Sequence, residues 1–167
     1  ALEFDGVNDN VTGTSVTLSA TSSISFWIEY STNVQAYLFY NGSDSSKNYI
    51  FNISSTNLRL TDRNGLIKSW DASTLINTKY HFLISQSAGN VTIYKNGVSL
   101  GTEVSDGIGF IDIIGSRNAG VQHFEGLFNE MSFCDGYAAT SQDAIDLWNS
   151  GNGSLATDVL SNVIRYY

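Results

Sequence analysis

The chain has 167 residues, of which 42% are hydrophobic and 13% aromatic, so it is able to build one packed domain and is not an intrinsically disordered chain. Sixteen acidic and eight basic residues give a net charge of −8, and the basic residues are scattered, which argues against a nucleic-acid partner. No apolar run approaches the roughly 20 residues of a membrane-spanning helix, so we expect no membrane insertion.

The remaining composition favours an all-β, surface-exposed protein. There are fifteen glycines, no proline and few strong helix formers. The one cysteine, Cys134, excludes an intrachain disulfide and a zinc site made of several thiolates, and we expect it to be a small buried residue of a strand. Because the sequence begins at Ala1 and stops within a strand-like segment, we expect residues 1–167 to be a single domain of a larger chain.

A period-two alternation of apolar and polar residues predicts strands along most of the chain. In chain order the predicted strands are 23–30, 36–40, 48–54, 58–61, 66–70, 80–86, 91–94, 98–100, 111–115 and 126–133. Asn96-Gly97 is the strongest hairpin signal, because both residues tolerate the positive φ of a type I′ turn. Short strands separated by Gly and Asn turns predict an antiparallel sandwich or barrel, and no alternating strand–helix pattern supports a parallel sheet.

One helix is predicted near the end of the chain, at residues 141–149. Thr140 or Ser141 provides the N-cap, and Asp143 lies in the first turn, where the helix dipole favours negative charge. Ile145 and Trp148 should pack on a sheet. After a small polar linker, residues 159–167 predict a last strand.

Three segments together resemble the laminin-G-like members of the concanavalin A-like lectin/glucanase superfamily. Residues 2–11 look like the opening strand and loop of the family, and residues 80–98 like its hairpin around an Asn-Gly turn. Residues 114–131 and 144–151 look like its late strand and C-terminal helix. The resemblance implies a two-sheet antiparallel jelly-roll sandwich with one short helix near the C-terminus, in which residues 163–167 lie beside the first strand.

Many domains of this family hold calcium, so the resemblance implies a structural Ca²⁺ site at Asp5, Asn8, Asn129 and Glu130, where the opening loop would meet the late strand. Calcium takes six to eight oxygen ligands. Asn8 and Asn129 stand where family members often carry Asp, which lowers the negative charge of the site. The alternative is that Asp5, Asn8 and Asn129 cap turns through side-chain to backbone hydrogen bonds.

Catalytic chemistry is disfavoured by the sequence. A glycosidase needs two carboxylates across a cleft, and the family's glucanases place them in a Glu-x-Asp-x-x-Glu strand that this chain lacks. Two histidines and no nucleophile motif also argue against a Ser/His/Asp triad. We therefore expect no enzymatic activity.

Binding of a glycan is the function that the resemblance favours. Sugars stack on aromatic rings and bond to neighbouring polar groups, and Trp70, Tyr40 and His123 are the candidate ligand-binding residues, with Trp70 expected to be exposed. For each of these residues the alternative is packing in the core. We interpret the chain as a carbohydrate-binding or adhesive module that meets a glycan or cell-surface polysaccharide.

The composition also suggests where such a module works. Its Asn, Ser and Thr richness without a disulfide favours an extracellular adhesin or a virion surface, such as a phage structural protein. The first alternative is a structural decoration or assembly module of a virion or surface layer that binds other surface proteins. The second is a glycoside hydrolase with two facing carboxylates.

Overall fold

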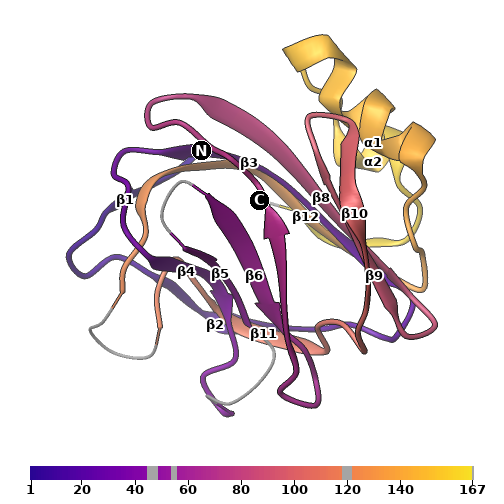
Figure 1. The fold of residues 1–167 in the computed structure, drawn as a ribbon, viewed down its shortest axis with the longest axis horizontal. Helices are drawn as coiled ribbons and strands as arrows, with labels where there is room; N and C mark the ends of the chain where they lie inside the picture. The colour runs from indigo at the N-terminus through magenta and orange to yellow at the C-terminus, as the bar shows by residue number, and fades with distance from the viewer. Residues whose placement is uncertain (45–48, 54–55, 118–121, 167) are drawn as a thin grey trace.

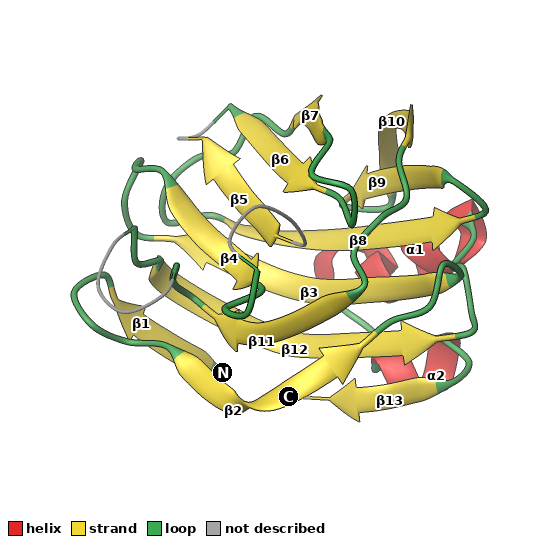
Figure 2. Ribbon diagram, turned by 90° about the horizontal axis from the view of Figure 1, so that it is seen from below, coloured by secondary structure: helices red, strands yellow, loops and turns green. Residues whose placement is uncertain are grey.

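Two antiparallel sheets stack face to face, and a helical segment covers the outer side of one of them (Figures 1 and 2). The computed structural model describes residues 1–44, 49–53, 56–117 and 122–166. The predicted all-β jelly-roll sandwich with a short C-terminal helix is therefore confirmed.

The seven-stranded sheet has the order β1-β12-β3-β8-β9-β10, with β13 also paired to β12. Its strands are β1 (Leu2–Asp5), β3 (Ser22–Tyr30), β8 (Lys79–Ser87), β9 (Asn90–Lys95), β10 (Val98–Val104), β12 (Glu125–Asp135) and β13 (Val163–Tyr166). The six-stranded sheet has the order β2-β11-β4-β5-β6-β7. Its strands are β2 (Val11–Thr17), β4 (Ala36–Tyr40), β5 (Tyr49–Ile53), β6 (Asn57–Thr61), β7 (Ile67–Asp71) and β11 (Phe110–Ile114).

The core lies between the two sheets and is built mainly from aromatic and branched side chains. Strand β3 contributes Ile24, Phe26 and Ile28, each at most 1% exposed, as its alternation predicted. Phe26 packs edge-to-face on Phe39 of the other sheet, with ring centroids 5.1 Å apart. Such contacts between sheets exclude water and account for most of the stability of a sandwich.

The hairpin predicted at Asn96-Gly97 is confirmed. Both residues have positive φ, 50° and 78°, and Lys95 pairs directly with Val98 across a two-residue turn. The turn itself lies against a helix, because a Cβ added to Gly97 would come 3.2 Å from the Trp148 ring. Gly97 is thus required both for the turn and for the close approach of α1.

The helical segment contains α1 (Ser141–Trp148), the 3-10 turn η1 (Asn149–Gly151) and α2 (Ala156–Val159). Thr140 caps α1 in a capping box: its hydroxyl accepts a hydrogen bond from Asp143 N, and the Asp143 carboxylate accepts one from Thr140 N. The end of α1 is marked by Asn149, which adopts the left-handed conformation with φ 45°.

Strand β2 was missed, the predicted last strand begins later than expected, and the expected burial of Cys134 is confirmed. Strand β2 was not predicted, because its sequence VTGTSVT is mostly small and polar. The predicted last strand 159–167 instead begins with the end of helix α2, and β13 starts at Val163, where it lies beyond β1 along the same side of β12. Cys134 is fully buried in β12, and burial raises the pKa of its thiol to about 12.

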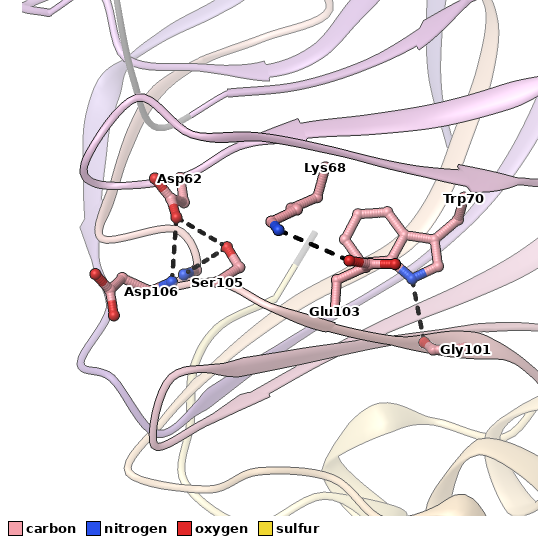
Figure 3. A network of polar contacts seen from close by, with 8 residues as sticks. Asp62, Lys68, Trp70, Gly101, Glu103, Ser105 and Asp106 are labelled. Atoms are coloured by element: carbon pink, nitrogen blue, oxygen red, sulfur yellow. Dashed lines mark hydrogen bonds and ion pairs between the residues drawn. The ribbon is translucent and has the colours of Figure 1, made fainter.

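The edges β7 and β10 of the two sheets meet and close one side of the sandwich (Figure 3). The Trp70 indole donates a hydrogen bond to the Gly101 carbonyl at 3.1 Å, and Lys68 pairs with Glu103 at 3.7 Å.

Next to these contacts, the fully buried Asp62 carboxylate accepts four hydrogen bonds, two from its own turn and two from residues 105 and 106. A buried carboxylate is tolerated there because backbone and hydroxyl donors replace its water.

None of the helices in the described part of the chain has the length and apolar character that crossing a membrane requires.

Candidate functional site

The residues predicted to hold calcium do not come together. Strand β1 runs antiparallel to β12 so that Asp5 lies opposite Glu125 and Leu2 opposite Phe128. Asn129 is therefore at the far end of β1, four residues from Glu125, or about 13 Å at 3.3 Å per residue. Glu130 follows it in a β-bulge of β12. The predicted set of four ligands is wrong, because the antiparallel register separates its two halves.

Asp5 and Asn8 instead build the turn that follows β1. The Asp5 carboxylate accepts hydrogen bonds from the backbone N–H groups of Val7, at 2.8 Å, and Asn8, at 3.4 Å. The bond from Val7 is the main reason why the pKa of Asp5 lies below its usual value. Within the described residues no group of three or more His, Cys, Asp and Glu side chains could hold a metal ion. The four predicted residues therefore do not form one calcium site, and Asp5 and Asn8 serve the turn.

The three predicted ligand-binding residues are all buried. Trp70 is 3% exposed, not exposed as predicted, because its ring enters the core and its indole bonds to β10. His123 is 9% exposed, and its Nδ1 lies 3.3 Å from the Asp9 carbonyl. Tyr40 is 0% exposed, so its ring offers no free face to a sugar. It nevertheless belongs to the most informative cluster of the molecule.

That cluster is the tyrosine face, which we define as Tyr37, Tyr40, Tyr49, Thr61 and Arg117. The rings of Tyr37 and Tyr40 lie 5.3 Å apart and perpendicular, and Tyr49 lies 5.3 and 6.0 Å from them. Together with Ile113 they form a cluster separate from the core between the sheets. The tyrosine face is therefore on the outer side of the six-stranded sheet, the side away from the helices (Figure 2).

The backbone register explains how distant residues reach this face. Ile113 pairs with Tyr40, and Tyr49 pairs with Thr61 on the next strand. Residues directly opposite each other in a sheet point to the same side, so each of these pairs shares the outer surface. Tyr49 is partly exposed, whereas its neighbour Tyr40 is fully buried.

Buried hydroxyls without partners mark the tyrosine face. The Tyr40 hydroxyl and Thr61 Oγ1 are buried and form no hydrogen bond with any described residue, and neither does the buried Ser116 Oγ beside Arg117. Buried polar groups are almost always hydrogen-bonded, and an exception points to a water or a ligand. The hydroxyls of Tyr40 and Thr61 lie beneath the tyrosine face and are buried, so a ligand reaches them only where the side chains that cover them move aside.

Arg117 adds the only cation–π contact of the tyrosine face among the described side chains. Its guanidinium carbon lies 5.7 Å from the centroid of the Tyr37 ring. The Tyr40 hydroxyl lies near the guanidinium, outside hydrogen-bond geometry, and is the largest of the influences that raise the pKa of Arg117. Arg117 is partly exposed, so the guanidinium is accessible to solvent.

The loop after β4 lies at the border of the tyrosine face and supplies further polar groups. Asn41 accepts hydrogen bonds at its side-chain oxygen from Ser43 N and Asp44 N, which fixes the turn predicted at Asn41-Gly42. Gly42 N donates to the Asp112 carboxylate at 2.6 Å. A Cβ at Gly42 would come 2.9 Å from the terminal methyl of Ile113, so Ile113 would have to shift to accommodate another residue there.

The outer side of the seven-stranded sheet is occupied differently. Leu83, Tyr94 and Cys134 point outward and pack against Leu147 of α1 and Leu160 after α2. Trp27, also on this side, is 5% exposed because Gly153 packs close to its ring, where an added Cβ would come 3.4 Å from it. The helical segment therefore covers the aromatic residues of this sheet, and they are not available to a ligand.

A family model described as the concanavalin A-like lectin/glucanases superfamily matches residues 5–145. The chain belongs to this superfamily. The resemblance on which the sequence analysis relied is confirmed. A comparison with curated protein sequences found no significant match.

Solved structures of this superfamily fold are similar over most of the chain. A native heptameric SAP-like pentraxin from Limulus polyphemus has a TM-score of 0.74 at 16% identity, covering 99% of this chain and 89% of the pentraxin. A Bacteroides ovatus protein named for carbohydrate binding has 0.71 at 16%, covering 99% and 52%. Domain 4 of AbnA, a GH43 extracellular arabinanase from Geobacillus stearothermophilus, solved with arabinotriose, has 0.62 at 19%, covering 78% and 68%. At these identities the likeness concerns the fold.

The superfamily includes glucanases, which use two carboxylates across a cleft, so a pocket lined by carboxylates is a second candidate site. Glu3 and Asp5 of β1, Glu29 of β3 and Glu125 of β12 line a cavity of about 300 Å³. It lies on the seven-stranded sheet, at the end away from the helices (Figure 2). The backbone bonds that lower the pKa of Asp5 act against a role as a general acid, which needs a raised pKa.

Neither the tyrosine face nor the carboxylate-lined pocket was predicted as a group of neighbouring residues. Of the rings of the tyrosine face, only Tyr40 was among the predicted ligand-binding residues. Tyr37 and Tyr40 are three residues apart and would face opposite sides of a regular strand, but a register shift in β4 between Tyr37 and Phe39 brings both to the outer side. Arg117 follows a strand that has no tyrosine, so nothing in its local sequence places it here. The four acidic residues come from three strands, which only the sheet order brings together.

Proposed function

We propose that the chain is a non-catalytic carbohydrate-binding module and that its ligand lies on the tyrosine face. The observation that carries this proposal is the partly exposed Tyr49 ring next to buried hydroxyls that have no partner among the described residues, on the outer sheet face that the helices leave open. Membership of the lectin/glucanase superfamily supports it.

The chemistry of the tyrosine face suits a sugar. Tyr49 offers an aromatic surface for the apolar C–H side of a pyranose ring, and aromatic side chains with a few placed polar groups are the usual lining of ligand sites. The hydroxyls of Tyr40 and Thr61 are buried in the free protein and form hydrogen bonds to sugar hydroxyls only once the side chains over them move aside. An apolar partner would leave both groups unsatisfied, at a cost of about 1–3 kcal/mol each.

Two of the similar structures favour the same function. One is named for carbohydrate binding, and another was solved with arabinotriose bound. The proposed partner is a glycan or cell-surface polysaccharide. The proposed location is therefore the outside of a cell or the surface of a virion, where such polymers are met.

A glycan array of the folded domain tests the proposal. We expect binding to a subset of glycans, unchanged by a calcium chelator because the predicted calcium ligands are not together. Tyr49→Ala should weaken binding at least tenfold, whereas Tyr137→Ala, near the helices, should not. Tyr49→Phe, which keeps the ring, should retain most of the binding.

Two outcomes would contradict the proposal. If the folded domain binds no glycan, the chain is better explained as an assembly module that binds surface proteins. If it instead releases reducing sugar from a polysaccharide, and Glu29→Gln or Glu125→Gln abolishes the release, the carboxylate-lined pocket makes it a glycoside hydrolase. That second function is favoured by the pocket alone, and we expect no hydrolysis.

A further inference from the structure

The guanidinium of Arg117 lies against aromatic rings and not against a carboxylate of the described residues. Its contacts are with the tyrosine rings, and no carboxylate of the described residues forms an ion pair with it. Guanidinium groups usually contact carboxylates or carbonyl oxygens through their five N–H donors. A cation that is held by aromatic rings and lacks an anionic partner is a candidate for binding an anionic group of a ligand.

Four other basic residues, Arg63, Lys95, Lys68 and Lys79, have contacts within the protein that allow a comparison. Arg63 donates to three backbone carbonyls, those of residues 18, 19 and 108. Lys95 donates to the carbonyls of residues 72 and 73, and Lys68 pairs with Glu103. Lys79 lies over the Trp27 ring, 4.8 Å from its centroid, on the opposite side of the molecule. Arg117 combines partial exposure with proximity to unpartnered hydroxyls.

The geometry of an arginine near a tyrosine leaves its donors available. A guanidinium attracted to a ring uses its charge and its flat face, while the N–H groups point outward in its plane. A carboxylate accepts two of them at once in a bidentate pair. Lysine, a point charge with a flexible stem, does not reproduce this arrangement.

The surrounding charges restrict which anions suit the tyrosine face. The net charge of −8 repels a polyanion such as a nucleic acid. Asp112 lies in the strand beside Tyr40, with its carboxylate held by Gly42 N. A ligand with a single carboxylate among many hydroxyls satisfies Arg117 and the buried hydroxyls together, without placing further negative charge next to Asp112.

We propose that the ligand of the tyrosine face is an acidic saccharide, a sugar bearing a carboxylate such as a sialic or uronic acid, and that Arg117 binds this carboxylate. This inference rests on the proposed carbohydrate-binding function. Arg117 is then the residue that separates acidic from neutral glycans.

Titration calorimetry with matched probes tests the inference. The probes are 3′-sialyllactose against lactose, and galacturonic acid against its neutral methyl ester. We expect the acidic member of at least one pair to bind tenfold or more tightly, and the difference to shrink as salt is raised from 50 to 300 mM, because salt screens partly exposed charges. In Arg117→Gln the affinity for the acidic probe should fall to that for the neutral probe. In Arg117→Lys only part of the difference in affinity should remain.

The outcomes separate the two proposals. Lys79→Gln removes a cation from the opposite side of the molecule and should leave the preference unchanged. Equal affinity for both members of each pair would overturn the acidic-saccharide inference and leave the carbohydrate-binding function in place. A preference that survives Arg117→Gln would also overturn the inference. No binding of any neutral or acidic glycan by the folded protein would overturn the proposed function itself.

Discussion

The two outer faces of the sandwich carry similar residues with different surroundings. On the seven-stranded sheet, Trp27 and Tyr94 are covered by the helical segment. Beneath that cover, His81 Nδ1 and Ser132 Oγ form no hydrogen bond with any described residue. On the six-stranded sheet, the hydroxyls of Tyr40 and Thr61 also have no partner among the described residues, but they lie beside a partly exposed Tyr49 that no helix covers. The difference teaches that neither aromatic content nor an unpartnered polar atom identifies a binding surface alone; the layer above them decides.

The largest expected effect is on the covered face. Leu147 is 2% exposed and fills the contact between α1 and the seven-stranded sheet. Leu147→Ala should lower the free energy of unfolding by ~2–5 kcal/mol, because it leaves a cavity in that contact. Ile145→Ala, on the same helix and 48% exposed, is the matched control and should change stability by about 0.5 kcal/mol or less. Urea unfolding measures both, and equal effects would show that the helix does not cover the sheet as described.

A second prediction concerns pH and the same covered face. His81 is 1% exposed, its Nε2 lies 2.9 Å from Ser25 Oγ, and burial lowers its pKa from 6.5 to about 4. Between these values the unfolded chain binds the proton and the folded one does not, so stability falls as pH drops from 6.5 to 4. At 1.36 kcal/mol per pKa unit the full loss is about 3 kcal/mol.

The variant His81→Gln isolates this contribution. Acidic groups such as Asp5, whose pKa is lowered, also destabilise the fold in acid, but they act equally in both proteins. The wild type should therefore lose stability relative to His81→Gln as pH falls from 7 to 4, measured by urea unfolding at several pH values. Parallel curves would mean that His81 is already solvated, and that the helical cover does not dehydrate it.

The smallest effect is expected at the cap of α1. Thr140→Ala removes the hydroxyl that accepts the Asp143 N–H bond and should cost about 1 kcal/mol of stability. Thr140→Ser keeps the cap and should behave like the wild type in thermal unfolding. Glycan affinity should be unchanged in both variants, and a loss of binding with Thr140→Ala would move the ligand site toward the helices.

Much of the fold was predictable, because local patterns report directly on backbone geometry. The alternation in β3 predicted its core face correctly, and Asn96-Gly97 predicted the hairpin. The same alternation puts Ser25 and Trp27 on the opposite side of β3, and both are also buried. A period of two shows that a strand has two sides; it does not show that a helix from the end of the chain will cover the second one.

The candidate site was less predictable, since its members are distant in sequence. Tyr40 and Arg117 meet because β4 pairs with β11, and Asp5 and Asn129 are separated because β1 runs antiparallel to β12. The expected exposure of Trp70 failed for a similar reason: two sheet edges meet at β7 and β10, and the ring turns inward to bond with Gly101.

By itself the sequence determined the fold class, the superfamily, the main strands, the Asn96-Gly97 turn and the capped helix, since each depends on residues that are close in the chain. Only the tertiary structure decided which aromatic residues are covered, which hydroxyls lack partners among the described residues and where Arg117 lies. These properties depend on sheet order and register, which bring together residues tens of positions apart, and no local pattern encodes that meeting.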